Sequence, residues 1–254
     1  MRGVLAIAQR ELGAYFRTPL GWMCLGAWLV VTGYFFGWSM DLYSEVSIQT
    51  ASSPFGDPVD VDTHLVGQFF GNWVVVLIFL CPALCMRLVA EDRQTGAYVL
   101  LSSSPLSSTQ IVLGKYLGVM GFVVVSLLAT LHYPYFMLRW AEPDVGILLS
   151  SYLAVFLLAS TFVAVGLLAS TLARSQIVAL LSSFAVLLVF WVMGVGEGAV
   201  DAGWRDWVSD LSMLPHAQPM LRGLIQGSDL MYFFSVNLLL LFAAQQRLEL
   251  ERWQ

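Results

Sequence analysis

Six stretches of the sequence contain no Asp, Glu, Lys or Arg, and each is 17 to 29 residues long. A helix needs about 20 mostly apolar residues to cross a bilayer, so each stretch predicts one membrane-spanning helix. The last stretch is the shortest, and we expect its helix to begin a few residues earlier. The predicted spans are residues 20–40, 65–86, 116–138, 145–173, 175–196 and 230–246.

The overall composition excludes an ordinary soluble domain. Of the 254 residues, 58% are apolar and only 11% are charged, and the mean hydropathy is +0.76. Soluble domains carry about 25% charged residues, so this chain could not cover its surface in water. The alternating pattern of a membrane barrel strand is absent. We therefore predict an all-α integral membrane protein in which residues 1–254 form a single transmembrane domain.

The basic residues set the predicted orientation, because they gather on the cytoplasmic side of membrane proteins. If the N-terminus is cytoplasmic, nine of the twelve basic residues lie inside and only Arg139, Arg205 and Arg222 lie outside. Both termini are then cytoplasmic. Residues 41–64 become a polar outer loop, 139–144 a tight outer turn, and 197–229 a longer outer segment.

Residues 1–18 predict an amphipathic helix that lies in the headgroup layer rather than a signal peptide. Apolar side chains share one broad face, and Arg10 and Arg17 lie on the opposite face. Pro19 then breaks the helix and turns the chain into the bilayer. Glu11 intrudes on the apolar face. Two interpretations stay open for it: a contact with protein, or an inert side chain that reaches water.

Residues 87–115 form the predicted cytoplasmic coupling segment between the second and third spans. A charged group is followed by a glycine that permits a bend and then by apolar residues that need cover. Those apolar residues either pack on the membrane and neighbouring spans or dock on a cytoplasmic partner. The residues singled out are Glu91, Asp92, Arg93, Gly96, Tyr98, Leu100, Leu101 and Pro105.

The chemistry of an enzyme is missing from the sequence. A phosphate-binding P-loop would need Gly where Thr109 stands and Ser or Thr where Tyr116 stands, so Lys115 is interpreted as a basic anchor at the cytoplasmic end of the third span. No charged residue lies deep inside the predicted spans, which disfavours an ion-coupled carrier. Cys81 and Cys85 share a helix face but are interpreted as small core residues, and no metal site is predicted.

Three loose motifs, in order, resemble the permease subunits of ABC-2 transporters, and most closely the short permeases of gliding motility and of nitrous-oxide-reductase maturation. The stretch at 8–21 resembles their entry helix. In the second motif Ala97 and Val99 depart from the usual Thr and Glu. The second motif matches at Glu91, Arg93, Gly96, Leu100, Leu101 and Pro105, and the third at Leu211, Ser212, His216, Gly223, Ile225, Asp229, Tyr232 and Phe233.

The resemblance implies an ABC-2 exporter-like subunit of the bacterial inner membrane that hydrolyses nothing itself. A cytoplasmic ABC ATPase subunit, in two copies, would bind ATP and Mg and would contact the coupling segment and the entry helix, at Arg10, Glu11, Arg17 and Pro19. A second permease subunit, identical or homologous, would complete the membrane unit. Residues 197–229 would form an extracytoplasmic re-entrant segment whose gate residues are Glu197, His216, Gly223 and Asp229.

Two further hypotheses remain at this point. The chain could be a stand-alone channel or carrier, although it lacks the intramembrane charges such a protein uses. It could instead be a non-transporting scaffold through which an ATPase does mechanical work on an extracytoplasmic partner. The substrate, and the residues that line any pathway, are not specified by the sequence. Nothing in it indicates a nucleic-acid partner.

Overall fold

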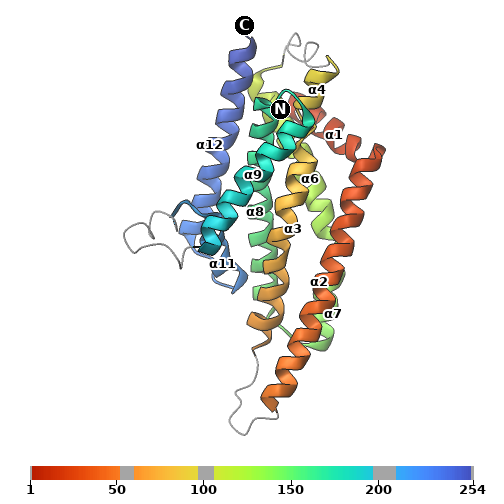
Figure 1. Cartoon of the computed structure of the whole chain (residues 1–254), viewed down its shortest axis with the longest axis vertical. Coiled ribbons are helices and arrows are strands. Elements are labelled where there is room, and N and C mark those ends of the chain that lie inside the picture. Colours follow the sequence, from red (N-terminus) through yellow and green to blue (C-terminus); the bar gives the residue numbers. More distant parts are fainter. Residues whose placement is uncertain (1, 52–59, 97–105, 197–209, 253–254) are drawn as a thin grey trace.

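The computed structural model is an elongated bundle of helices (Figure 1). It describes residues 2–51, 60–96, 106–196 and 210–252, and none of these residues is in a strand. Six helical segments in the described ranges are long and apolar enough to cross a membrane. The all-α membrane fold predicted from the charge-free stretches is therefore confirmed.

The described residues form eleven helical elements. α1 is the entry helix, η1 is a short π-helix that leads into α3, and α7 continues α6 after a turn. The bounds are α1 Arg2–Arg17, α2 Pro19–Ala51, η1 Asp62–Gly67, α3 Gln68–Cys85, α4 Ala90–Gln94, α6 Ser108–Ala129, α7 His132–Trp140, α8 Val145–Leu172, α9 Gln176–Val195, α11 Met213–Leu221 and α12 Gly227–Arg252.

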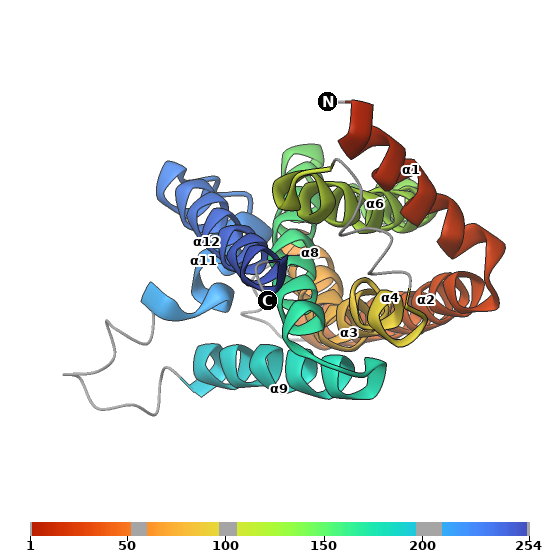
Figure 2. The ribbon, with the colours of Figure 1, turned by 90° about the horizontal axis from the view of Figure 1, so that it is seen from above.

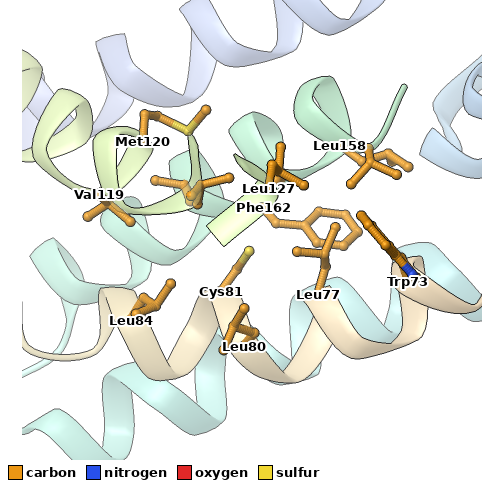
Figure 3. Close-up of a cluster of buried hydrophobic side chains, with 14 of the residues drawn as sticks. Trp73, Leu77, Leu80, Cys81, Leu84, Val119, Met120, Leu127, Leu158 and Phe162 are labelled. Carbon is orange, nitrogen blue, oxygen red and sulfur yellow. The ribbon is translucent and has the colours of Figure 1, made fainter. Parts of the chain in front are cut away.

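α8 is the central helix, and it packs against α3, α6, α9, α11 and α12. Figure 3 shows the core between α3, α6 and α8, where Trp73, Cys81 and Leu84 face Val119 and Phe162. A side chain on Gly166 of α8 would place its Cβ 2.6 Å from the Cβ of Cys85, so glycine permits this close packing. Small residues are what membrane helices use for such contacts, because lipid competes with any purely apolar attraction.

One polar cluster joins the helices at the middle of the bundle. The Nδ2 of Asn237 in α12 donates to the hydroxyls of Ser160 and Thr161 in α8, at 3.1 and 3.0 Å. Tyr116 of α6 donates to the Asn237 Oδ1 at 3.3 Å. Hydrogen bonds of this kind hold membrane helices together with about 0.6 kcal/mol each.

α1 runs across one end of the bundle and packs beside α6 (Figure 2). The contact depends on glycines of α6. A Cβ on Gly114 would lie 2.6 Å from the Cβ of Ile7, and one on Gly118 would lie 2.6 Å from the Cβ of Glu11. Real Cβ atoms do not approach this closely, so α1 can reach this position only because α6 has bare backbone there.

The corner between α1 and α2 is equally tight. Pro19 begins α2, and a Cβ on Gly21 would lie 2.1 Å from the carbonyl oxygen of Tyr15. The Tyr15 hydroxyl donates to the Leu84 carbonyl oxygen at 2.7 Å and so fixes α1 against α3. The predicted break at Thr18 and Pro19 lies at this corner.

The structure corrects the predicted outer loop at 41–64. α2 continues without a break to Ala51, well beyond the predicted end of the first span at residue 40. At 1.5 Å per residue its 33 residues extend about 50 Å, which exceeds the hydrocarbon thickness of about 30 Å. The helix continues because residues 41–51 contain neither Gly nor Pro, so nothing in them ends it.

Three other predicted boundaries also differ. α6 begins at Ser108, where Ser107 and Gln110 form a capping box, so residues 108–115 belong to this helix and not to a loop. The predicted span 116–138 is divided at Thr130 and Leu131, after which α7 begins. α12 extends from Gly227 to Arg252, beyond the predicted 230–246.

We predict that Gly118→Ala displaces α1, since the added methyl group must push against Glu11. The expected loss of stability is about 1–3 kcal/mol, as for other overpacked contacts, and it is measured as a lower midpoint of thermal unfolding in detergent.

Gly13→Ala in α1 is the matched control, because a Cβ there meets nothing within 4 Å. It should leave the midpoint unchanged or raise it, because the better helix propensity of alanine adds at most ~1 kcal/mol to the free energy of unfolding. Equal effects of the two substitutions would contradict the close contact.

Candidate functional site

A buried lysine joins three elements at the end of the bundle that carries α1 and α4. Lys115 of α6 is 1% exposed. Its Nζ donates to the Glu11 carboxylate of α1 at 3.0 Å, to the Asp92 carboxylate of α4 at 2.7 Å, and to the Leu88 carbonyl oxygen. An ammonium group has three N–H donors, so each of them has a partner here. We call Lys115, Glu11 and Asp92 the lysine junction.

Glu11 is drawn into the junction from α1 by two cations. Its Oε1 also accepts from the Arg10 guanidinium at 2.8 Å. Burial raises the pKa of the Glu11 carboxyl, but the charges and hydrogen bonds of Lys115 and Arg10 lower it more, so the pKa lies below its ordinary value of 4.5. Of the two interpretations of Glu11, the structure therefore favours the protein contact, and its partner lies within the same chain.

Arg93 connects α4 to α8 and α12. Its guanidinium donates to the carbonyl oxygens of Ala173 and Thr171, at 2.7 and 2.6 Å. The last carbonyl oxygens of a helix have no hydrogen-bond donor within the helix. At the end of α8, the Arg93 guanidinium provides donors for two of them. The same guanidinium meets both carboxylate oxygens of Glu251 in α12, at 2.9 and 2.7 Å.

The start of α4 is also held by other elements. The Ser170 hydroxyl of α8 accepts hydrogen bonds from the backbone N–H groups of Val89 and Ala90, at 3.0 and 3.2 Å. Arg87 pairs with Glu91 at 2.8 Å and donates to the Thr18 hydroxyl at 3.2 Å. These contacts attach α4 to α8 and to the corner between α1 and α2.

The predicted coupling residues therefore have different surroundings. Asp92 and Arg93 are bound inside the chain, and Glu91 is partly exposed beside Arg87. Gly96 has a φ of +74°, the left-handed region, and open space around it. Tyr98, Leu100, Leu101 and Pro105 lie outside the described residues. In the entry helix Arg10 and Arg17 are exposed, as is Pro19, and only Glu11 reaches the lysine junction.

Two of the predicted gate residues meet near the opposite end of the bundle. His216 of α11 and Asp229 of α12 are joined by a bond of 2.9 Å between Nδ1 and Oδ1. The Tyr232 ring stacks on the imidazole at 4.0 Å, and its hydroxyl donates to the Leu211 carbonyl oxygen at 2.8 Å. Within the described part of the chain, the His216 Nε2 and the Asp229 Oδ2 are buried without a hydrogen-bond partner.

Gly223 forms the turn between α11 and α12. Its φ is +86°, and a Cβ there would lie 2.8 Å from a side-chain carbon of Ile147 in α8. Both the backbone angle and the space available require glycine. Glu197, the remaining gate residue, lies outside the described residues.

Sequence reasoning missed the role of Lys115. It was interpreted as a basic anchor at the end of a span, whereas it lies two turns inside α6 and is buried. Glu251 and Ser170 were also missed as partners of the coupling segment. One signal was available for Lys115: a glutamate on the apolar face of the entry helix needs a buried cation, and this lysine stands among glycines that admit a close neighbour.

The fold and these two sites define a class: a polytopic membrane protein of six spans, in which an entry helix and a short helix after the second span are both ion-paired with a lysine of the third span. Comparison with known families gives the particular group. The sequence profile described as ABC-2 family transporter protein matches residues 39–244, and the chain belongs to this family. It is a membrane permease component of the ABC transporter type. A comparison with curated proteins finds no match.

We predict that Lys115→Met loosens α1 and α4, because it leaves Glu11 and Asp92 as buried carboxylates without their cation. Removing one partner of a buried pair costs about 3–5 kcal/mol. The measurement is the midpoint of thermal unfolding, together with the rate of limited proteolysis in α1.

Adding Glu11→Gln and Asp92→Asn to Lys115→Met should restore most of the loss, since the unpaired charges are then gone. If Lys115→Met unfolds at the wild-type temperature, the lysine junction does not hold these elements together.

The junction also predicts a dependence on pH. Because the folded-state pKa of Glu11 is lowered, its contribution to stability is fully present above pH 4.5 and is lost as the pH falls through the folded-state pKa. The difference in unfolding midpoint between the wild type and Glu11→Gln should thus be constant above pH 4.5 and shrink below it. A difference that grows on acidification would contradict this account.

Proposed function

We propose that this chain is the permease subunit of an ATP-driven ABC transporter, and that a separate ATPase subunit docks at the end of the bundle formed by α1 and α4. The observation that carries the proposal is the lysine junction. It links the two elements expected to meet the ATPase, α1 and α4, to the spanning helix α6 through one buried cation.

The connections of α4 support a role in transmitting force. Arg93 extends the same network to α8 and α12, and Ser170 holds the start of α4 to α8. A push on α4 would therefore act on three spanning helices together. The left-handed Gly96 lets the chain turn away from α4 directly before Tyr98, Leu100, Leu101 and Pro105, which we propose contact the ATPase.

The few buried charges inside the bundle support the proposal that a separate subunit supplies the energy for transport. Within the described residues of the six spanning segments, the buried charged side chains are Lys115 and Asp229, and each has a partner. A carrier driven by an ion gradient uses ionisable groups that can bind and release their ion along the pathway. A cation whose three donors are engaged is poorly suited to that work.

The remaining parts of the proposal concern assembly and orientation. α1 and the end of α12 lie at the same end of the bundle, as six crossings require (Figure 1). We place this end in the cytoplasm of a bacterial inner membrane, with two ATPase copies that bind ATP and Mg. A second permease subunit would complete the pathway, and the joined residues His216 and Asp229 would belong to its extracytoplasmic gate.

Co-purification from native membranes tests the proposal. The wild-type chain should bring down an ABC ATPase, and Leu101→Asp should reduce its recovery at least about tenfold while the permease stays folded, since a buried charge disrupts an apolar contact.

Ile48→Asp is the control, because Ile48 is 69% exposed on the extension of α2 at the other end of the chain. It adds the same charge at an exposed apolar position and should leave ATPase recovery unchanged. Absence of any ATPase from wild-type preparations, or equal recovery with both variants, would refute docking at the proposed end.

A further inference from the structure

A pocket whose lining includes an arginine and two glutamines lies at the opposite end of the bundle from α1 and α4. It has a volume of about 260 Å³ and is formed by η1, the start of α3 and the helix α11. Thr63, Gln68, Gln218 and Arg222 are its polar lining residues, and Leu214 and Leu221 supply its apolar wall. The Thr63 hydroxyl is engaged, since it donates to the Asp60 carboxylate at 2.6 Å. Its lining includes no residue of the lysine junction and neither His216 nor Asp229.

The polar groups of the pocket are free to bind a ligand. Among the described residues, none forms a hydrogen bond or ion pair with the side chains of Gln68, Gln218 or Arg222. A guanidinium carries five N–H donors in a planar fork, and the two amides add further donors and acceptors. Two elements of the chain, α3 and α11 with its C-cap residue Arg222, thus bring unengaged polar side chains to one small space.

The backbone around the pocket leaves room for a ligand. A Cβ on Gly71 would meet nothing within 4 Å, so the wall made by α3 is bare at that position. η1 is a π-helix, a conformation that is rare and that occurs often at functional sites. It shifts the start of α3 relative to a regular helix and helps to shape this side of the pocket.

No acidic side chain of the described residues lines the pocket, and Arg222 is the charged residue among its lining residues. Acidic residues lie nearby, and Asp60 accepts a hydrogen bond at 2.6 Å from the hydroxyl of Thr63, which does line it. Asp62 accepts a hydrogen bond from the Asp144 backbone N–H at 3.0 Å, and Asp144 accepts one from the Gly146 N–H at 2.7 Å. Arg222 therefore sets the sign of the site. Arginine with amide donors suits an anion that offers several oxygens, and a phosphate group fits the guanidinium fork best.

We propose that this pocket binds a phosphate-bearing group, either the headgroup of an anionic phospholipid or a small soluble phosphate ester. The pocket lies at the end of a spanning helix, where headgroups are found, and its volume is just below the 300–1,000 Å³ of pockets for drug-sized molecules. It would hold a headgroup while any acyl chains lie outside against the bundle. The proposal does not depend on the ATPase.

Native mass spectrometry of the purified full chain tests this site. The probes are dioleoyl-phosphatidylglycerol and, as the phosphate-free comparison, dioleoylglycerol. The wild type should retain the phospholipid in preference to dioleoylglycerol. Arg222→Gln should weaken its retention at least about tenfold, which corresponds to ~1.4 kcal/mol. Gln218→Leu should weaken it in the same direction.

Arg139→Gln is the matched control, because Arg139 is an exposed arginine at the end of α7 and does not line the pocket. It should retain the phospholipid as the wild type does. Equal losses in Arg139→Gln and Arg222→Gln would indicate general attraction of arginine to lipid and overturn the proposal, as would full retention in Arg222→Gln.

The soluble ester is tested by competition with glycerol phosphate. Displacement of the phospholipid that requires Arg222 supports the ester as ligand, and retention of the phospholipid in its presence supports the lipid headgroup. If neither probe binds the wild type, the pocket is not a phosphate site. None of these outcomes alters the test of ATPase docking, so the two proposals can fail separately.

Discussion

A buried ammonium group must be paired, and the pairing of Lys115 organises one whole end of this protein. Its two carboxylate partners come from helices that do not cross the membrane, so one side chain fixes both α1 and α4 to α6. The close crossing at Gly118 brings Glu11 within reach, and the junction in turn keeps α1 against the glycines. Packing and electrostatics here depend on each other, because neither contact would form at a larger separation.

The sequence was sufficient to predict the bounds of those spans whose ends are marked by charged or capping residues outside the helix. α8 and α9 begin after Asp144 and Ser175 and lie within one residue of the predicted 145–173 and 175–196. It failed where a charge lies inside a helix: the predicted spans begin at residue 116 and end at residue 246, whereas Lys115 lies within α6 and Arg247 lies within α12. The bond between Lys115 and Glu11 joins residues 104 positions apart, and no local pattern specifies such a pair.

The family match does not include the entry helix, whereas the structure shows this helix packed against the matched region. The match covers residues 39–244 and so begins after the entry helix and most of α2. The contacts of Glu11, Tyr15 and Thr18 with α6, α3 and the start of the coupling segment place α1 within the same packed body. Charged side chains expected to face a partner are largely bound within the chain, which leaves apolar residues as the proposed contact surface.

The bond between Arg93 and Glu251 has a consequence for how the protein is made. These residues are 158 positions apart, and Glu251 lies three residues from the end of the chain. During synthesis Arg93 leaves the ribosome long before its carboxylate partner exists. The anchoring of α4 to α12 can therefore form only after the last of the six spanning helices has been made.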